Sequence, residues 1–208
     1  MSSATDSRSP RNLVVVPRRD LSFDFVNTLA WRGSAPTESL HSIGELLGWM
    51  VSSKAMTERA ATELSNWFAA HPAQGVTVFG AAIESREMIY RLLRSIASDS
   101  PPAREDLRRL NRALGEAGSR QILDRADKGF GWRIEAKTTV AGILAPMLWS
   151  TADILVSPDA ARVRQCANDR CLWLFRDDSK NGTRRWCSMQ ACGNRAKAHR
   201  HYLRQKAQ

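Results

Sequence analysis

Apolar residues recur at intervals of three and four through most of the first 117 residues, the spacing that places them on one face of a helix. Thr57 is a suitable cap for one of these helices, and Pro101 and Pro102 suit a break before another. The pattern therefore predicts a mainly helical domain. Its expected helices cover residues 38–50, 57–70, 76–97 and 103–117.

The helical period breaks between residues 120 and 136, where two strand-like segments flank the turn-forming sequence 127–129. A β-hairpin is expected there. Residues 140–156 are the longest apolar run and belong to a helix expected over 139–156, but polar residues interrupt the run and it is at the short limit for crossing a bilayer. We expect a buried helix, kinked or broken at Pro146, and no membrane partner.

The chain has 208 residues, of which 43% are hydrophobic, enough for one ordinary core and a small appendage. We predict a mainly α (α+β) fold in three parts: a flexible tail over 1–17, a helical domain over 18–157 and a zinc module over 158–208. Pro158 is placed to begin a short helix that carries Arg162 and Arg164. Because the first ten residues are polar and unlike a signal peptide, a cytoplasmic location is expected.

The zinc module takes its name from the four cysteines of the chain, Cys166, Cys171, Cys187 and Cys192. Each pair has four residues between its members, and fifteen residues separate the pairs. This spacing predicts one structural zinc ion held by four thiolates, with no position left for a substrate. Two disulfides or four unrelated buried thiols are the alternatives, but nothing indicates the oxidising compartment that disulfides require.

Positive charge is concentrated in the same module. Residues 162–208 contain 12 Lys and Arg against three acids, a net charge of +9, while the whole chain carries +10. Four thiolates around one Zn²⁺ would lower the charge of the module to about +7. A field of one sign over so few residues predicts a polyanionic partner, with nucleic acid as the expected one.

Within the module, short strands are expected over 172–176 and 184–188, joined by a turn that contains Asn181 and Gly182. This hairpin would bring the two cysteine pairs together. Gly193 gives the backbone freedom that a metal corner needs, and Asn194 suits the N-cap of a following helix. The prediction is a treble-clef-like or ribbon module, hairpin then helix. Its metal would be covered by packing aromatic residues, Trp173, Phe175 and Trp186.

The C-terminal helix should carry a basic stripe opposite an apolar face that contains Ala196 and Leu203. Such a helix can lie along phosphates or in a DNA major groove. His199 and His201 are expected at the surface, because four cysteines already complete the metal site. The residues predicted to contact nucleic acid are Arg184, Arg185, Arg195, Lys197, Arg200 and Arg204.

The sequence Cys-Gly-Asn-Arg at 192–195, with Cys-Ala-Asn-Asp-Arg-Cys at 166–171 and Arg-Arg-Trp-Cys at 184–187, closely resembles the bacterial CGNR zinc-finger family. In that family the finger follows a domain called ABATE, and residues 21–29 and 84–92 resemble the opening and middle of that domain. The resemblance implies a stress-induced transcription regulator that binds zinc through the four cysteines. Arg176 departs from the family pattern, where an aliphatic residue is common, without affecting the metal ligands.

The helical domain shows no phosphate loop, nucleophile elbow or metalloprotease motif, so we expect no enzymatic activity. Polar Asp24, Asn27 and Thr28 interrupt the apolar stretch 21–29. They fit either internal capping and helix packing or a ligand-sensing pocket. The residues predicted for such a pocket are Asp24, Asn27, Arg32 and Arg86.

Two classes of function stay open for the whole chain. A third alternative is that the N-terminal half is an enzyme of unknown substrate. In the first class, the module binds DNA and the helical domain senses an effector or forms a homodimer. The protein would then act at the bacterial nucleoid. In the second class, the module binds RNA or docks a protein on a helical scaffold.

Overall fold

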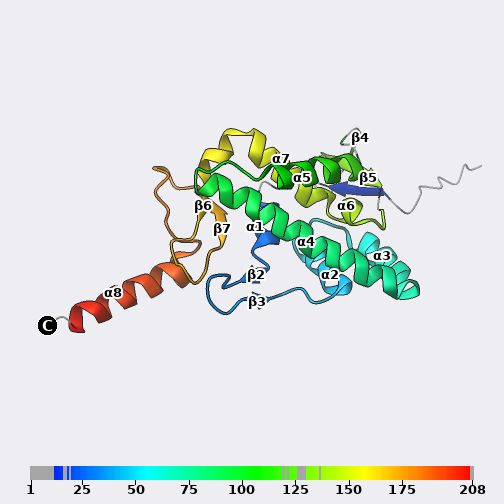
Figure 1. The fold of residues 1–208 in the computed structure, drawn as a ribbon. Helices are drawn as coiled ribbons and strands as arrows, with labels where there is room; N and C mark the ends of the chain where they lie inside the picture. The colour runs from blue at the N-terminus through cyan, green and yellow to red at the C-terminus, as the bar shows by residue number, and fades with distance from the viewer. Residues whose placement is uncertain are drawn as a thin grey trace, which may run out of the picture.

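The protein is mainly helical, and its last helix projects from the rest of the molecule (Figure 1). This computed structural model describes residues 12–15, 18, 20–118, 120, 122–125, 130–135 and 137–206. The α-helices are α1 (Leu21–Val26), α2 (Ile43–Ser52), α3 (Glu58–Ala70), α4 (Pro72–Ala97), α5 (Arg104–Glu116), α6 (Val140–Ile143), α7 (Ala145–Val156) and α8 (Asn194–Lys206).

Short antiparallel strands form three small sheets in the described part of the chain. The first has the order β1 (Asn12–Val15), β5 (Phe130–Glu135), β4 (Ile122–Arg125). The second pairs β2 (Leu29–Ala30) with β3 (Thr37–Glu38), and the third pairs β6 (Val163–Gln165) with β7 (Leu174–Arg176). A 3-10 helix, η1 (Pro158–Arg162), precedes β6, and a π-helical turn, η2 (Met189–Gly193), leads into α8.

The long helix α4 is the centre of the hydrophobic core and packs against α1, α2, α3, α5, α6 and α7. Its Ile89, Leu92 and Leu93 are fully buried. Burying side chains of this size stabilises the fold by about 1.5–3 kcal/mol each. The helix begins at Pro72, four residues before the predicted start, because proline fits the first turn of a helix without losing an intrahelical hydrogen bond.

Several predicted boundaries are confirmed by capping geometry. The Thr57 hydroxyl accepts a hydrogen bond from the N–H of Ala60 at 3.3 Å, at the start of α3. The stretch 139–156 is broken at Leu144 into α6 and α7, with Pro146 in the first turn of α7. Both helices are largely buried, and no helix in the described residues is long and apolar enough to span a membrane. The β4–β5 hairpin is also confirmed, although its predicted turn at 127–129 lies outside the described residues.

The helix predicted from residue 38 begins only at Ile43. Glu38 lies in β3 instead, and its carboxylate accepts hydrogen bonds from the N–H groups of Ser39 and Leu40. Ser42 then caps α2 by accepting from the N–H of Glu45 at 3.2 Å. The prediction was wrong because these local side-chain bonds compete with the helix for the same backbone groups.

The predicted flexible tail was wrong for residues 12–15, which form β1 against β5. Asn12 lies opposite Glu135, and Val15 lies opposite Trp132. The valine-rich segment gains sheet hydrogen bonds because a distant hairpin offers it an edge. The other residues of 1–17 lie outside the described part of the chain. Pro158 does begin a short helix, but Arg164 lies in β6 and not in that helix.

Candidate metal centre

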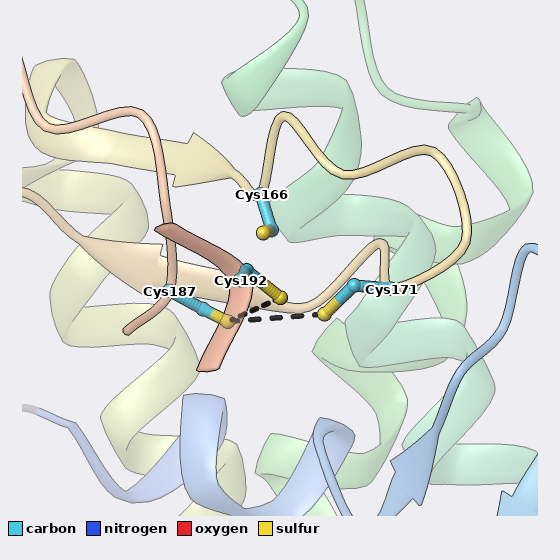
Figure 2. A group of neighbouring side chains, drawn as sticks. All are labelled: Cys166, Cys171, Cys187 and Cys192. Atoms are coloured by element: carbon cyan, nitrogen blue, oxygen red, sulfur yellow. Dashed lines mark hydrogen bonds between the residues drawn. The ribbon is translucent and has the colours of Figure 1, made fainter. Parts of the chain in front are cut away.

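The four cysteines converge from three parts of the zinc module. Cys166 follows β6, and Cys171 precedes β7. Cys187 precedes η2, and Cys192 lies within it. In Figure 2 the four side chains surround a common point. All four sulfur atoms lie within 4.8 Å of one another. The sulfur of Cys187 is 3.8 Å from that of Cys171 and 3.7 Å from that of Cys192.

These distances fit a tetrahedral zinc ion. A Zn–S bond of about 2.3 Å in a tetrahedron places neighbouring sulfurs about 3.8 Å apart. A disulfide would need sulfurs about 2.05 Å apart, and all four cysteines are free. Because four thiolates complete the coordination, the chain binds one structural zinc ion, and the disulfide alternative is excluded.

The thiols also show why a cation belongs among them. A hydrogen bond from the neighbouring Cys187 thiol lowers the pKa of Cys166 to about 5. Burial and the negative charge of Cys166 raise the pKa of Cys171 to about 12, and the pKa of Cys187 is raised by its bond to Cys166. Thiolates this close repel one another, so all four ionise together only when a divalent cation balances their charge.

Aromatic side chains cover the cysteines as predicted. Phe175 is buried with Cys166, Cys171 and Cys192, and Trp173 and Trp186 pack around this cluster. Trp31, which sequence reasoning missed, joins the cluster from the helical domain. The guanidinium of Arg195 lies 4.4 Å from the centre of its ring. No local pattern marks Trp31, because its partners lie more than a hundred residues away.

The module contains a hairpin, but not the predicted one: β7 pairs with β6, and residues 184–188 are not a strand. A buried carboxylate decides this arrangement. Asp177 accepts hydrogen bonds from the N–H groups of Ser179 and Arg184, both at 2.9 Å, and from the Ser179 hydroxyl at 2.5 Å. One side chain thus closes the turn, so no strand ladder is needed. Gly182 adopts φ +64° in this turn, a conformation that suits glycine.

The predicted cap at Asn194 was wrong. Ser188 caps the helical segment by accepting a hydrogen bond from the N–H of Ala191, and η2 continues directly into α8 at Asn194. Gly193 is needed for close packing, since a Cβ there would lie 2.7 Å from the sulfur of Met189. Cys192 therefore lies in the π-helical turn that continues into the basic helix, and the metal fixes that end of α8.

The predicted nucleic-acid contacts divide into two groups. Arg195, Lys197 and Arg204 are exposed on α8 and form no ion pair among the described residues. Arg184 and Arg185 are also exposed. However, Arg184 donates to the carbonyl oxygens of Trp186 and Cys187 and lies over the ring of Phe175, and Arg185 lies over Trp186. Arg184 therefore braces the second cysteine pair. The side chain of Arg200, like those of His199, His201 and Leu203, lies outside the described residues.

In the described part of the chain, the residues predicted for a sensing pocket make internal contacts in three separate places. Asp24 pairs with Arg18 at 2.7 Å, and Asn27 bonds to the backbone of Leu174. Arg32 and Arg86 both bond to Glu87. A cavity of 410 Å³ lies elsewhere, between α2, α3 and the start of α4. Ligand binding by the four predicted residues stays a prediction.

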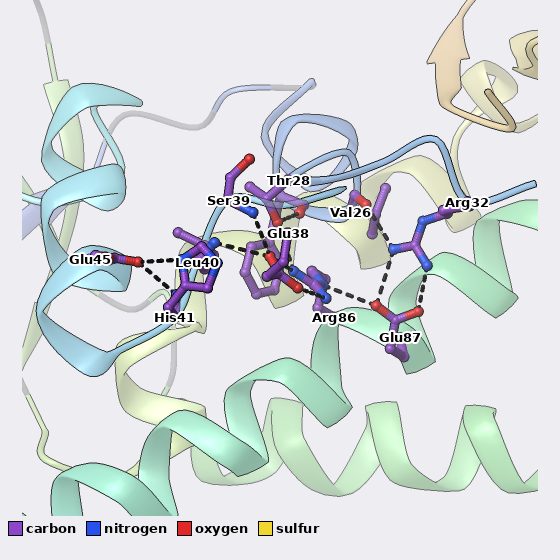
Figure 3. A network of polar contacts seen from close by, with 11 residues as sticks. Val26, Thr28, Arg32, Glu38, Ser39, Leu40, His41, Glu45, Arg86 and Glu87 are labelled. Carbon is purple, nitrogen blue, oxygen red and sulfur yellow. Dashed lines mark hydrogen bonds and ion pairs between the residues drawn. The ribbon is translucent and has the colours of Figure 1, made fainter. Parts of the chain in front are cut away.

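Arg86 is the centre of a buried ion-pair network, drawn in Figure 3. It is 1% exposed and donates both terminal nitrogens to Glu38 at 2.7 Å, as well as bonding to Thr28 and Glu87. Burial alone would raise the pKa of Glu38, but the hydrogen bonds and charge of Arg86 outweigh burial and lower it. The polar interruption at Thr28 thus serves internal packing.

Comparison with protein families agrees with this architecture. A model of the ABATE family, described as "Putative stress-induced transcription regulator", matches residues 19–158, and a model of the CGNR zinc finger matches residues 162–205. A search of curated proteins found no match to the chain. Since the first match covers more than half of the sequence and the second contains all four metal ligands, the chain belongs to the ABATE family and carries a C-terminal CGNR zinc finger.

Proposed function

We propose that the protein is a DNA-binding transcription regulator whose basic helix α8 is fixed in place by the zinc ion. The observation that carries this proposal is the positive charge that α8 exposes. Between Asn194 and Lys206 the helix contains no acid, and its described cations are exposed. Its main contact among the described elements is η2, and it projects into solvent (Figure 1).

The mechanism is positional. Because Cys192 lies in η2, which continues directly into α8, the metal orders the start of the helix before any partner arrives, and binding does not have to order this segment. Lys197 and Arg204 can then meet phosphates and release the condensed counterions of the nucleic acid. An α-helix fits the major groove of B-DNA, where side chains near its anchored end can reach base edges.

The test uses the full-length, zinc-loaded protein and a fluorescent DNA duplex. Lys197→Gln and Arg204→Gln should each weaken binding on all sequences and reduce the slope of log affinity against log salt by about one. Arg59→Gln is the matched control, because it removes the same charge from an exposed position on α3. If Lys197→Gln and Arg204→Gln bind DNA as tightly as the parent and the Arg59→Gln control, α8 is not the contact surface.

Selection of bound sequences from random DNA, repeated with Cys187→Ser, tests whether the protein recognises a specific base sequence. A regulator predicts an enriched motif that is lost in the variant. Preference for structured RNA, or binding that ignores both salt and sequence, would favour the RNA-binding or protein-docking alternative.

The helical domain is proposed as the dimerisation or sensing part of this regulator, acting at the bacterial nucleoid. A regulator that reads a palindromic site presents two symmetric helices. Measurement of the molar mass in solution, with and without DNA, tests this part separately. A strict monomer under both conditions would contradict the palindrome version while leaving DNA binding by α8 open.

A further inference from the structure

The helical domain holds the β6–β7 hairpin of the zinc module through Asn27. The side-chain amide nitrogen of Asn27 donates to the carbonyl oxygen of Leu174 at 2.8 Å, and its oxygen accepts from the N–H of the same residue at 3.1 Å. One asparagine thus satisfies both backbone groups of a residue in β7, as a neighbouring strand would. The end of α1 therefore serves as an added edge for the metal-bearing hairpin.

Tyr90 of α4 holds the two ends of the first cysteine loop. Its hydroxyl donates to the carbonyl oxygen of Leu172 at 3.0 Å and accepts from the side-chain nitrogen of Gln165 at 2.9 Å. Gln165 directly precedes Cys166, and Leu172 directly follows Cys171. Leu172 has φ +57°, a conformation unfavourable for leucine, and the bond from Tyr90 helps to hold it there.

A third contact comes from the loop between β2 and β3. The N–H of Gly33 donates to the carbonyl oxygen of Arg170 at 3.2 Å, and a Cβ on Gly33 would lie 1.8 Å from the carbonyl oxygen of Asp169. The two backbones are thus in direct contact. Trp31, two residues earlier, packs on the cysteine cluster and lies under Arg195.

The hydrophobic core also joins the hairpin to the helical domain. Val163 of β6 and Leu174 of β7 are fully buried, and both belong to the core of the helical domain rather than to the cluster around the cysteines. The hairpin therefore presents one side to the core and carries the first two metal ligands at its end. Its geometry depends on the domain against which it packs.

We propose that Asn27, Trp31 and Tyr90 are positioning residues of the zinc site, so that zinc binding and the contact between the helical domain and the zinc module stabilise each other. The three side chains hold Cys166 and Cys171 at the separation that zinc requires. Such coupling is reciprocal, since a contact that increases the affinity for zinc must itself be strengthened by zinc to the same extent. This inference concerns metal binding and does not depend on the proposed DNA partner.

The first test measures zinc affinity of the full-length protein by competition with a chromogenic chelator. Tyr90→Phe keeps the ring and removes only the hydroxyl, with its hydrogen bonds to Leu172 and Gln165, and it should raise the dissociation constant for zinc by about 10-fold. Asn27→Ala removes two hydrogen bonds and should raise it by about 10-fold or more. The matched controls are Tyr202→Phe on α8 and Asn66→Ala on α3, both exposed positions that should leave the affinity unchanged.

The second test separates positioning from general stabilisation. Thermal unfolding midpoints are compared for each protein with zinc bound and after chelation. Coupling predicts that Tyr90→Phe lowers the midpoint of the zinc-bound protein much more than that of the chelated protein. Equal losses in both states, together with unchanged zinc affinity, would overturn the proposal. If Asn27→Ala does not fold, Tyr90→Phe and the conservative Trp31→Phe, which should retain more affinity than Trp31→Ala, decide the question.

Discussion

The helical domain and the zinc module are stabilised by different means. The helical domain packs its apolar side chains around α4, and the charges of its buried residues Arg86 and Asp106 are paired. The zinc module surrounds four cysteines with a few aromatic residues and leaves the described cations of α8 exposed. Ion pairs within the helical domain include Arg86–Glu38, Arg91–Asp106 and Arg120–Asp153.

This difference teaches how a short, strongly basic segment can be ordered. A segment of this size buries too little apolar surface to fold by itself, so a metal and contacts with a neighbouring domain replace the missing core. The described cations of α8 can then stay exposed, because the metal and the neighbouring domain, and not ion pairs of these cations, hold the fold. Four predictions test this contrast.

Removal of zinc should have the largest effect. Binding of a structural zinc ion contributes on the order of 10 kcal/mol, and most of the order in the zinc module should be lost with it. Circular dichroism should show loss of the α8 signal, while the other helices remain but melt at a lower temperature. Cys187→Ser should reproduce this result, and returning zinc to the chelated parent should reverse it. An unchanged spectrum after chelation would show that the module folds without metal.

Arg86→Met should have the next largest effect, confined to the helical domain. The change leaves the carboxylates of Glu38 and Glu87 without their buried partner, and the free energy of unfolding should fall by about 3 kcal/mol. Urea denaturation measures the loss. Adding Glu38→Gln should recover part of it, because an unpaired charge is removed. A loss under 1 kcal/mol in the single variant would indicate that the network contributes little.

Acid should destabilise the helical domain through the same carboxylates. The pKa values of Glu38 and Glu87 are lowered by Arg86 and Arg32, which outweigh the opposing effect of burial, and Arg91 lowers that of Asp106. The unfolded chain therefore takes up protons first, at about pH 4. The stability from these groups should be complete above that pH and decrease as the pH falls through the lower folded-state values. A stability that increases on acidification through this range would contradict the assignment, as measured by urea denaturation.

The smallest effect is expected for Arg59→Gln. Arg59 pairs with Glu63 one helical turn away on the exposed face of α3. Such pairs contribute about 0.3–0.5 kcal/mol, so the midpoint of urea unfolding should barely change. A loss above 1 kcal/mol would show that the surface charges of this domain matter more than the contrast allows.

Much of the local structure was predictable from periodicity. The spacing of apolar residues indicated α3, α4 and α5, and Pro146 marked the break between α6 and α7. The strands were harder to predict, because a strand needs a partner that local sequence does not name. β1 looked like part of a tail, and β7 was assigned to the wrong partner.

The sequence by itself determined the metal site. Four cysteines at this spacing are typical of a zinc site. The excess of Lys and Arg around them is a property of composition that folding does not change. Only the tertiary structure decided what holds the site in place. The bond from Asn27 to Leu174 spans 147 residues, that from Tyr90 to Leu172 spans 82, and that from Arg86 to Glu38 spans 48. Periodicity and spacing report only near neighbours along the chain, so contacts that packing creates between distant residues leave no pattern in a single sequence.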